Sequence, residues 1–257
     1  MPKVSIVIPV HNGEKTLRRS LQSIADQTYR DFETIVVDNN CTDSSMDIAR
    51  EFQDSINLRI IKCEPKGIVP TLNTGIFAAQ SEWIARQDDD DYWYPEKLEK
   101  QMAFLEQNPD VGILGTQLRL LDPNGNEESV GTYGLYPKYP TNSNAIKGGL
   151  MTGQNCICHP SVVMKRDVIL RIGGYSDQFP LAEDMELWMK AIPFTAFANL
   201  EEVLVDYTQT VREDYDPRVV LILADMYYSF YRLIGLVEGE RPLQIFDWQR
   251  DSKRPML

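Results

Sequence analysis

The chain has 257 residues, of which 43% are hydrophobic and 25% charged, as in an ordinary soluble globular protein. Its formal net charge of −12 argues against a nucleic-acid partner and against a broad attraction to anionic lipid. The four cysteines lack metal-finger spacing, and the sequence shows neither a secretory signal nor a long uncharged apolar segment. We therefore expect a cytoplasmic α/β protein with one large domain.

Strand and helix patterns alternate four times in the first hundred residues. Continuous apolar runs predict strands buried on both faces of a sheet, and apolar residues at helical spacing predict the helices between them. The predicted strands cover 4–10, 32–37, 57–62 and 82–86, and the predicted helices cover 14–26, 43–52, 70–79 and 95–101. Right-handed crossovers place the carboxyl ends of these strands at one edge of a parallel sheet. We expect His11, Asp38, Lys66 and Asp88 to meet at that edge.

Beyond residue 101 the pattern is mixed. A strand over 111–121 and the turn residues after it predict a hairpin onto 128–132, and 133–144 has no period and predicts a loop. The remaining predicted elements are a strand over 161–164, a helix over 166–172, a helix over 180–192, one or two strands over 197–207 and a helix over 217–237. The last helix is too charged to span a bilayer. We expect it to pack on the domain, with a homodimer contact or a peripheral contact at the cytoplasmic face of a membrane as alternatives.

The acidic run Asp88-Asp89-Asp90-Asp91 lies between a predicted strand and a predicted helix. Four adjacent carboxylates repel one another, and some of them take up protons unless a cation lies among them. A solvated acidic loop is the plain interpretation. The position of the run favours a ligand site instead, because open α/β sheets bind ligands at the carboxyl ends of their strands. Carboxylate oxygens suit Mg²⁺ or Mn²⁺.

Several segments together resemble the family 2 glycosyltransferases of GT-A fold. They are 4–14, 27–33, 36–38, 42–43, Ala85-Arg86-Gln87-Asp88-Asp89-Asp90-Asp91, His159-Pro160-Ser161-Val162, Gly173-Gly174-Tyr175 and Ala182-Glu183-Asp184-Met185-Glu186-Leu187-Trp188. The match covers roughly residues 3–190 in the correct order. It implies a Rossmann-like, mostly parallel central sheet with helices on both faces over residues 1–212, followed by a C-terminal helix and tail at 213–257. Within the domain, 1–105 would bind the nucleotide sugar and 106–212 the acceptor.

The resemblance implies an inverting transfer of a sugar from a nucleotide-diphosphate sugar, in the first place a UDP-sugar. The acceptor would be a hydroxyl of a glycan or lipid-linked glycan, in polysaccharide or glycoconjugate synthesis. A divalent metal, Mn²⁺ or Mg²⁺, would neutralise the diphosphate leaving group. On the family pattern Asp90 is a direct metal ligand, Asp88 contacts the metal or the ribose, and Asp184 is the general base. A carboxylate near a helix start, as Asp184 is, would otherwise be read as structural.

The family pattern also assigns donor-binding and acceptor-binding residues. The donor set is Pro9, His11, Asp38, Asn39, Lys66, Gly67, Arg86, Asp88 and Asp89, and the acceptor region holds Trp93, His159 and Glu183. His11 stands where the family often has Tyr. Asn39 replaces a usual acid, although its side-chain carbonyl can still accept the N3 proton of uracil. The segment from Tyr207 to Arg212 lacks the His that many relatives carry there, so no further metal ligand is assigned from it.

Two other functions are open. Sugar-nucleotide nucleotidyltransferases also use an acidic metal site on a related sheet, but their first strand is usually followed by a Gly-rich loop with Thr-Arg, which His11-Asn12-Gly13-Glu14 lacks. A catalytically silent nucleotide-sugar-binding protein of the same fold would lack the metal-binding or base carboxylates, and the sequence has both.

Overall fold

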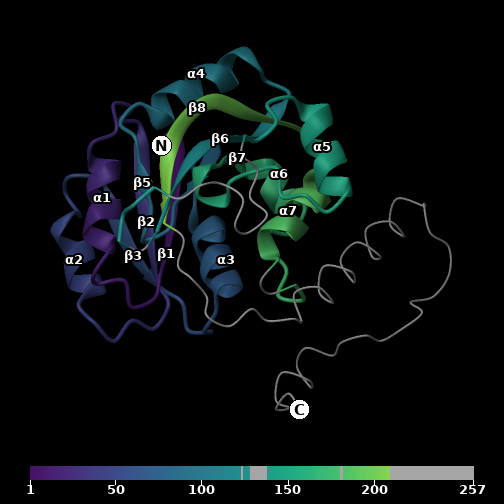
Figure 1. The fold of residues 1–257 in the computed structure, drawn as a ribbon. Coiled ribbons are helices and arrows are strands. Elements are labelled where there is room, and N and C mark those ends of the chain that lie inside the picture. The colour runs from purple at the N-terminus through teal and green to yellow at the C-terminus, as the bar shows by residue number, and fades with distance from the viewer. Residues whose placement is uncertain (123, 128–137, 180–181, 209–257) are drawn as a thin grey trace.

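The computed structural model describes residues 1–122, 124–127, 138–179 and 182–208, which form an α/β domain around one curled sheet (Figure 1). The strand order is β3-β2-β1-β4-β7-β6-β8-β5. The strands are β1 Val4–Val10, β2 Phe32–Asp38, β3 Leu58–Lys62, β4 Trp83–Arg86, β5 Tyr92–Trp93, β6 Val111–Leu121, β7 Val163–Lys165 and β8 Ala196–Thr208. The helices are α1 Leu17–Ala25, α2 Ser45–Glu51, α3 Ile68–Ala78, α4 Lys97–Gln107, α5 Ser143–Met151, α6 Arg166–Arg171 and α7 Glu183–Ala191, with a 3₁₀ turn at His159–Ser161.

The first four strands are parallel, as the alternation of strand and helix predicts. β1 pairs with β2 on one side and β4 on the other, and β3 pairs with β2. Every residue of β1 is buried, as expected for the central strand of a sheet with helices on both faces. The carboxyl ends of these strands therefore lie at one edge of the sheet, where Val10 is in register with Asp38.

The second half of the sheet is mixed. β7 runs antiparallel to both β4 and β6, while β8 runs parallel to β6. β8 is one strand of 13 residues, and near its end Asp206 pairs with Tyr92 of the short strand β5. This pairing returns the end of β8 to the acidic loop, because β5 begins directly after Asp91.

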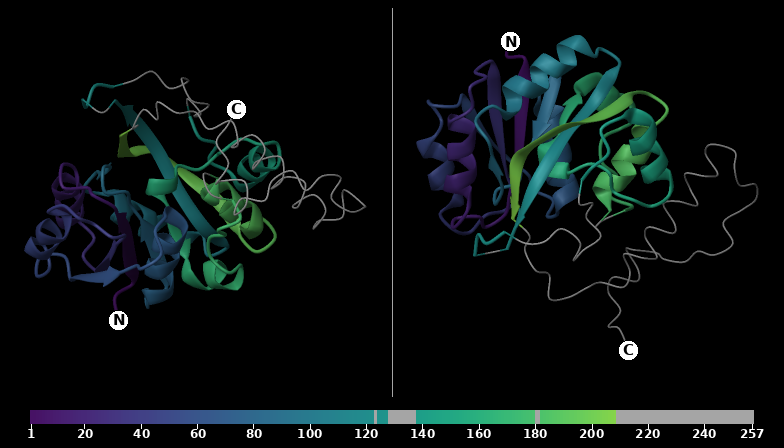
Figure 2. Two further views of the ribbon diagram at one scale, coloured as in Figure 1. Left: turned by 90° about the horizontal axis from the view of Figure 1, so that it is seen from below. Right: turned by 45° about the horizontal axis from the view of Figure 1, so that its top comes forward.

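Helices cover both faces of the sheet (Figures 1 and 2). The apolar residues of α3, α5, α6 and α7 belong to one buried cluster, and those of α1, α2 and α4 belong to another. β1 contributes to both clusters, because alternate side chains of a strand point to opposite faces: Val7 lies in the first cluster and Ile6 and Ile8 in the second. The expected GT-A-like architecture, a mostly parallel sheet between two helical layers, is confirmed.

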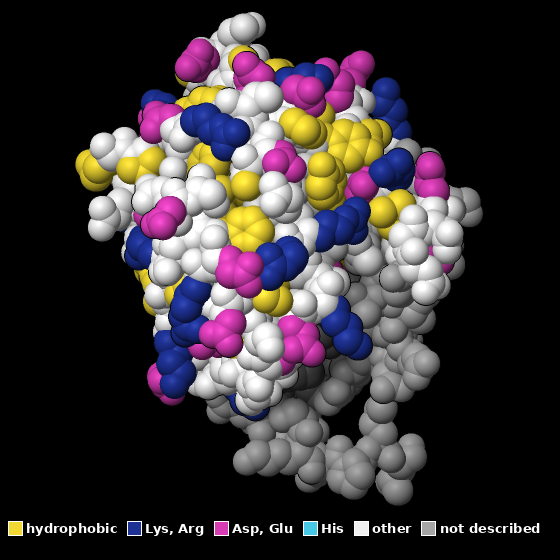
Figure 3. Space-filling view, turned by 90° about the vertical axis from the view of Figure 1, so that its left-hand side faces the viewer, with side chains coloured by type: hydrophobic (Ala, Val, Ile, Leu, Met, Phe, Trp, Pro, Cys, Tyr) yellow, Lys and Arg dark blue, Asp and Glu magenta, His cyan; other side chains and the backbone are white. Residues whose placement is uncertain are grey.

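The surface on the side of α1 and α2 carries acidic and basic side chains that are intermixed (Figure 3). Arg18 of α1 forms an exposed ion pair with Glu51 of α2 across 2.7 Å. This face therefore offers no continuous basic surface of the kind that a nucleic acid needs.

Three elements differ from the sequence prediction. α5 occupies 143–151, where the prediction had a loop as far as 144 and no helix; Asn142 caps it by accepting the Ala145 N–H across 2.9 Å. β5 was not predicted, because two residues carry no periodic signal. The strand expected at 161–164 starts at Val163, after the 3₁₀ turn.

Two predicted elements, the hairpin partner at 128–132 and the helix at 217–237, lie outside the described residues. The dimer or membrane contact predicted for the helix at 217–237 lies outside the described residues as well. Within the described ranges, every helix is too short or too polar to cross a bilayer.

Candidate active site

An open cavity of about 340 Å³ lies where β1, β2, β3 and β4 end. Its lining residues are Pro9, Val10, His11, Asn39, Lys66, Gly67, Ile68, Asp88 and Asp89. The structure thus brings together seven of the nine residues that the sequence assigns to the donor. Asp38 and Arg86 are near this edge but do not line the cavity. Parallel strand topology explains the convergence, because each contributing loop follows the carboxyl end of a strand.

Asn39 supplies a buried acceptor to the cavity. Its side chain is 8% exposed, and its Nδ2 donates to the carbonyl of Gly67 across 3.1 Å. Its Oδ1 is buried and has no hydrogen-bond partner among the described residues. A buried amide oxygen without a partner costs free energy unless a ligand or water donates to it. Gly67 has φ of 127°, a conformation that favours glycine, so the carbonyl that fixes Asn39 depends on this residue type.

His11 and Asp38 shape the loops around the cavity. The Nδ1 of His11 lies 2.7 Å from the carbonyl oxygen of Asn39, and since a carbonyl only accepts, the proton lies on Nδ1. Asp38 Oδ1 accepts the backbone N–H of Cys41 across 2.8 Å, which closes the turn after β2. Asp38 therefore holds the loop that presents Asn39.

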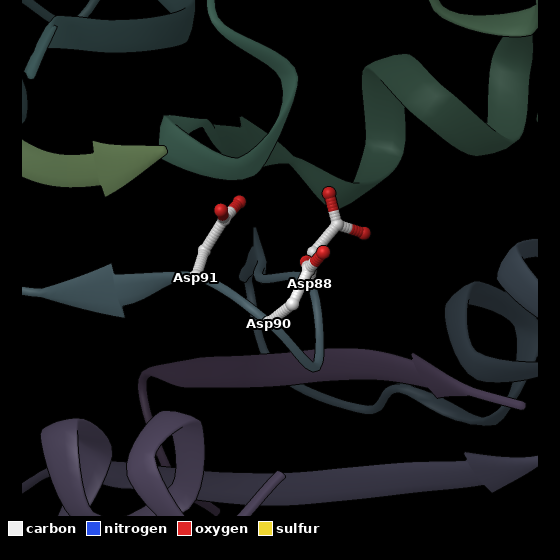
Figure 4. Close-up of side chains that lie close together, drawn as sticks. All are labelled: Asp88, Asp90 and Asp91. Atoms are coloured by element: carbon white, nitrogen blue, oxygen red, sulfur yellow. The ribbon is translucent and has the colours of Figure 1, made fainter. Parts of the chain in front are cut away.

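The acidic loop gathers three carboxylates. Asp88, Asp90 and Asp91 have oxygens that lie within 4.8 Å of one another, and their side chains point to the same side of the loop (Figure 4). Asp91 is fully buried; its Oδ1 accepts the Thr208 N–H across 2.8 Å, and its Oδ2 is buried without a partner among the described residues. Burial, followed by the charges of Asp88 and Asp90, raises the pKa of Asp91 well above its ordinary value.

This donor set fits a hard divalent cation. Converging carboxylate oxygens are what Mg²⁺ and Mn²⁺ take, and a cation would supply the partner that the Asp91 Oδ2 lacks. The sequence predicted Asp88 and Asp90 as ligands but not Asp91. The end of β8 holds this loop, because Thr208 Oγ1 also donates to the Asp90 carbonyl across 2.9 Å.

Asp89 forms a wall of the donor cavity. Its carboxylate lies so close to Gly13 that any Cβ at position 13 would collide with it, and it accepts the backbone N–H of His11. Burial, followed by the charges of Asp90 and Asp88, raises the pKa of Asp89 to about 7. A side chain at position 13 would therefore force the Asp89 carboxylate to move.

Arg86 forms a buried ion pair with Asp88. Its side chain is 5% exposed, and both terminal nitrogens contact the carboxylate, with Nη1 donating to Oδ2 across 2.6 Å. Burial opposes the charge of Arg86, but the charges of Asp88 and Asp91 keep its pKa above the ordinary value. Arg86 was predicted beside the donor; in the structure it pairs with Asp88, which lines the cavity, and does not line the cavity itself.

Asp184 lies in the first turn of α7. Its Oδ2 accepts from Asn155 Nδ2 and its Oδ1 from the Met185 N–H, both across 2.7 Å. No described cationic side chain forms an ion pair with Asp184. A general base needs this freedom from a tightly paired cation. Burial raises the pKa of Asp184, and the Met185 N–H, Asn155 and Arg86 act in the opposite direction.

The residues predicted for the acceptor region have different surroundings. His159 Nε2 lies 2.6 Å from the Tyr175 hydroxyl, and burial together with Arg86 lowers the pKa of His159, so the ring is neutral. Glu183 precedes Asp184 and is half-buried. Trp93 is a core residue instead: it is fully buried and its Nε1 donates to the Pro160 carbonyl across 2.9 Å. Its assignment to the acceptor region is corrected, because no face of its ring is open to a ligand.

The pKa of Tyr175 responds to charges from two parts of the candidate site. It is raised by burial and by the charges of Glu183, Asp184 and Asp88, and lowered by Arg86.

Comparison with known proteins decides the family. The model of glycosyl transferase family 2 matches residues 5–172, about two thirds of the chain. The chain belongs to this family. It is therefore a family 2 glycosyltransferase, and the predicted resemblance is confirmed.

Two similar glycosyltransferases have the same degree of identity to this chain. The chain is 32% identical over 222 residues to the putative glycosyltransferase EpsE of Bacillus subtilis (strain 168), covering 84% of this chain and 74% of EpsE. It is 32% identical over 209 residues to the O-antigen biosynthesis glycosyltransferase WbnJ of Escherichia coli, covering 79% and 78%. These matches extend beyond the region of the family model.

Solved structures share the GT-A fold. S. aureus TarS 1-349 in complex with UDP-GlcNAc has a TM-score of 0.68 at 22% identity, over 90% of this glycosyltransferase and 65% of the TarS chain. The mannosyltransferase PcManGT from Pyrobaculum calidifontis, in complex with GDP-Man and Mn²⁺, has a TM-score of 0.65 at 19% identity, over 94% and 66%. At these identities the likeness establishes the fold.

Proposed function

We propose that this glycosyltransferase moves a sugar from a UDP-sugar to a hydroxyl of a glycan or lipid-linked glycan, with inversion, in polysaccharide synthesis. The proposal rests on two features of the described residues: the buried Asn39 Oδ1 in the donor cavity, which has no hydrogen-bond partner among them, and the acidic cluster near the cavity. The name of WbnJ, an O-antigen biosynthesis glycosyltransferase, supports a polysaccharide product, and the UDP-GlcNAc complex of TarS supports a UDP-sugar donor.

The cavity suits the uridine part of the donor. Asn39 Oδ1 is an acceptor at the place where the family grips the base, and the N3–H of uracil is a donor that it can take. His11, which also lines the cavity, would stack on the base or close the pocket. Lys66, which also lines the cavity, supplies a positive charge for the diphosphate.

Asp88, Asp90 and Asp91 would hold the metal, Mn²⁺ or Mg²⁺. When bound, the ion would neutralise charge on the nucleoside diphosphate leaving group. Arg86 would keep the Asp88 carboxylate oriented toward the cluster. Thr208 would keep the Asp90 backbone and the Asp91 side chain in place through its two hydrogen bonds.

Asp184 would take the proton from the acceptor hydroxyl. The oxygen of that hydroxyl then attacks the anomeric carbon as the bond to the diphosphate breaks, and a single displacement inverts the configuration. Glu183, which precedes the base, and His159 would contact the acceptor. With Nε2 bonded to the Tyr175 hydroxyl, the Nδ1 of the neutral His159 ring would be the atom that serves a sugar hydroxyl.

A donor panel tests this function. The purified protein is incubated with Mn²⁺ or Mg²⁺ and with UDP-, GDP-, dTDP- and CDP-sugars, and nucleotide release and binding are measured. We expect a UDP-sugar to bind and turn over in a metal-dependent manner, with EDTA removing turnover. Turnover of a GDP-sugar alone would contradict the uridine assignment, and the lack of binding and turnover with every donor would contradict the transferase itself.

A further inference from the structure

The proposed base Asp184 has a side-chain partner outside its own helix. The Met185 N–H that bonds Oδ1 belongs to the start of α7, whereas Asn155 reaches Oδ2 from 29 residues away. A carboxylate held by one neighbour alone can still rotate, and the second hydrogen bond fixes both oxygens. Asn155 therefore sets the orientation of Asp184 from a segment outside α7.

A second contact fixes the orientation of the Asn155 amide. Its Oδ1 accepts the Ile157 N–H, at 3.4 Å. Since a backbone N–H can only donate, it selects the amide oxygen and leaves the amide nitrogen to face Asp184. A donor at that place stabilises the ionised carboxylate more than the protonated acid.

The segment that carries Asn155 is anchored to the domain core. Asn199 on β8 is 3% exposed, and its Nδ2 donates to the carbonyls of Cys156 and Pro140, across 2.9 and 2.7 Å. On the other side the Cys156 side chain packs against Gly149 of α5 so closely that any Cβ there would collide with it. These contacts place Asn155 independently of α7.

We propose that Asn155 is a positioning residue that holds Asp184 ionised and correctly oriented for proton transfer from the acceptor. This inference rests on the proposed role of Asp184 as the base. Among the described residues, the other titratable groups around Asp184 are Arg86 on β4, Tyr139, Tyr175 and, preceding it on α7, Glu183. Of these, Arg86 also favours the carboxylate, while burial opposes it. Removing the Asn155 side chain leaves the charge of the site unchanged.

The test is the pH dependence of turnover in Asn155→Ala. The readout is metal-dependent UDP release from the active UDP-sugar of the donor panel, measured as kcat/KM from pH 5 to 9, with UDP affinity measured by calorimetry. We expect the acidic limb of the profile to move to higher pH by about one unit, with activity returning toward wild type at alkaline pH. UDP affinity should not change, because Asn155 does not line the donor cavity.

Two further variants make the result decisive. Asn155→Asp, nearly the same shape, places a like charge beside Asp184 and should move the limb further in the same direction; it also provides the test if the alanine variant fails to fold. Asn142→Ala is the control, because Asn142 caps α5 in the same region and its loss should lower stability without moving the limb. A loss of activity that is equal at every pH, or an unmoved limb, would overturn the inference.

The outcome also separates this inference from the proposed function. If Asp184→Asn retains turnover, the base assignment fails, and the role of Asn155 fails with it. If Asp184→Asn abolishes turnover while Asn155→Ala keeps the wild-type profile, Asp184 remains the base and only the role of Asn155 is wrong.

Discussion

Asn39 donates a hydrogen bond to the carbonyl of Gly67 across 3.1 Å, and this bond determines which end of the Asn39 amide remains for a ligand. Because the carbonyl takes the amide nitrogen, the atom without a partner among the described residues is the oxygen. The loops after β2 and β3 together present a hydrogen-bond acceptor, the Asn39 Oδ1, to the donor cavity.

Replacing Asn39 with Ala should weaken UDP binding by about tenfold, because it removes both the acceptor for the base and the contact with Gly67. Calorimetry with UDP and GDP measures this loss and the change in preference. Asn40→Gly is the matched control: Asn40 donates to the carbonyls of Cys63 and Glu64, does not line the cavity, and has φ of 58°, which glycine tolerates. Equal losses of UDP affinity in both variants would contradict a direct role for Asn39.

Asp91→Asn should affect metal binding and stability in opposite directions. Without metal, the variant relieves the repulsion of a buried carboxylate by Asp88 and Asp90, and its amide oxygen can still accept the Thr208 N–H. The melting temperature in EDTA should rise by a few degrees, since about 1 kcal/mol shifts it by about 2–4 °C in a chain of this size. The further rise on adding Mn²⁺ should shrink, because a ligand is lost.

Thermal unfolding with and without Mn²⁺ measures both effects of Asp91→Asn. Asp110→Asn, an exposed acid at the start of β6, serves as the control and should keep the wild-type response to the metal. An undiminished response in Asp91→Asn would mean that Asp88 and Asp90 bind the ion without Asp91.

The parallel half of the sheet could be predicted because its signals are local. Each apolar run and each helical period lies within about ten residues, and crossover handedness then orders the strand ends. α5 escaped prediction, since Gly148 and Gly149 interrupt its helical pattern. β5 exists only because the end of β8 pairs with it, a contact between residues more than a hundred positions apart.

The donor cavity could be predicted for the same reason, whereas three features of the site could not. The roles of Asp91 and Asn155 depend on Thr208 and Asp184, which are distant in the sequence. Trp93 was misplaced because an aromatic residue after an acidic motif looks identical in the sequence whether its ring faces a ligand or the core. Its Nε1 finds its partner in the turn that contains Pro160, which only the tertiary structure shows.

The raised pKa of Asp89 predicts a pH-dependent stability. Burial first, and then Asp90 and Asp88, bring the folded pKa to about 7, whereas an Asp in an unfolded chain titrates near about 3.9. Between about pH 4 and 7 the folded protein retains a proton that the unfolded chain has released, so the free energy of unfolding falls as pH rises. Asp89→Asn should lose less stability over this window, and Asn can still accept the His11 N–H.

Denaturant unfolding of the metal-free wild type and Asp89→Asn at pH 5 and pH 7.5 measures the Asp89 contribution. The difference in free energy of unfolding between the two proteins should grow in favour of the variant at the higher pH. Asp110→Asn should follow the wild type at both pH values. Parallel behaviour of wild type and Asp89→Asn would show that Asp89 does not carry this titration.

Asp184→Asn should separate donor binding from chemistry. The donor cavity does not include Asp184, so UDP affinity should stay within about twofold of the wild-type value, a free-energy change of less than about 0.5 kcal/mol. Transfer should fall by about 10²–10⁴-fold, the usual contribution of a general base. Steady-state kinetics with the active UDP-sugar, together with calorimetry, measures the two quantities. Asp177→Asn, in the exposed loop before α7, is the control and should keep both. A parallel loss of UDP affinity and turnover in Asp184→Asn would instead show that Asp184 organises the donor site.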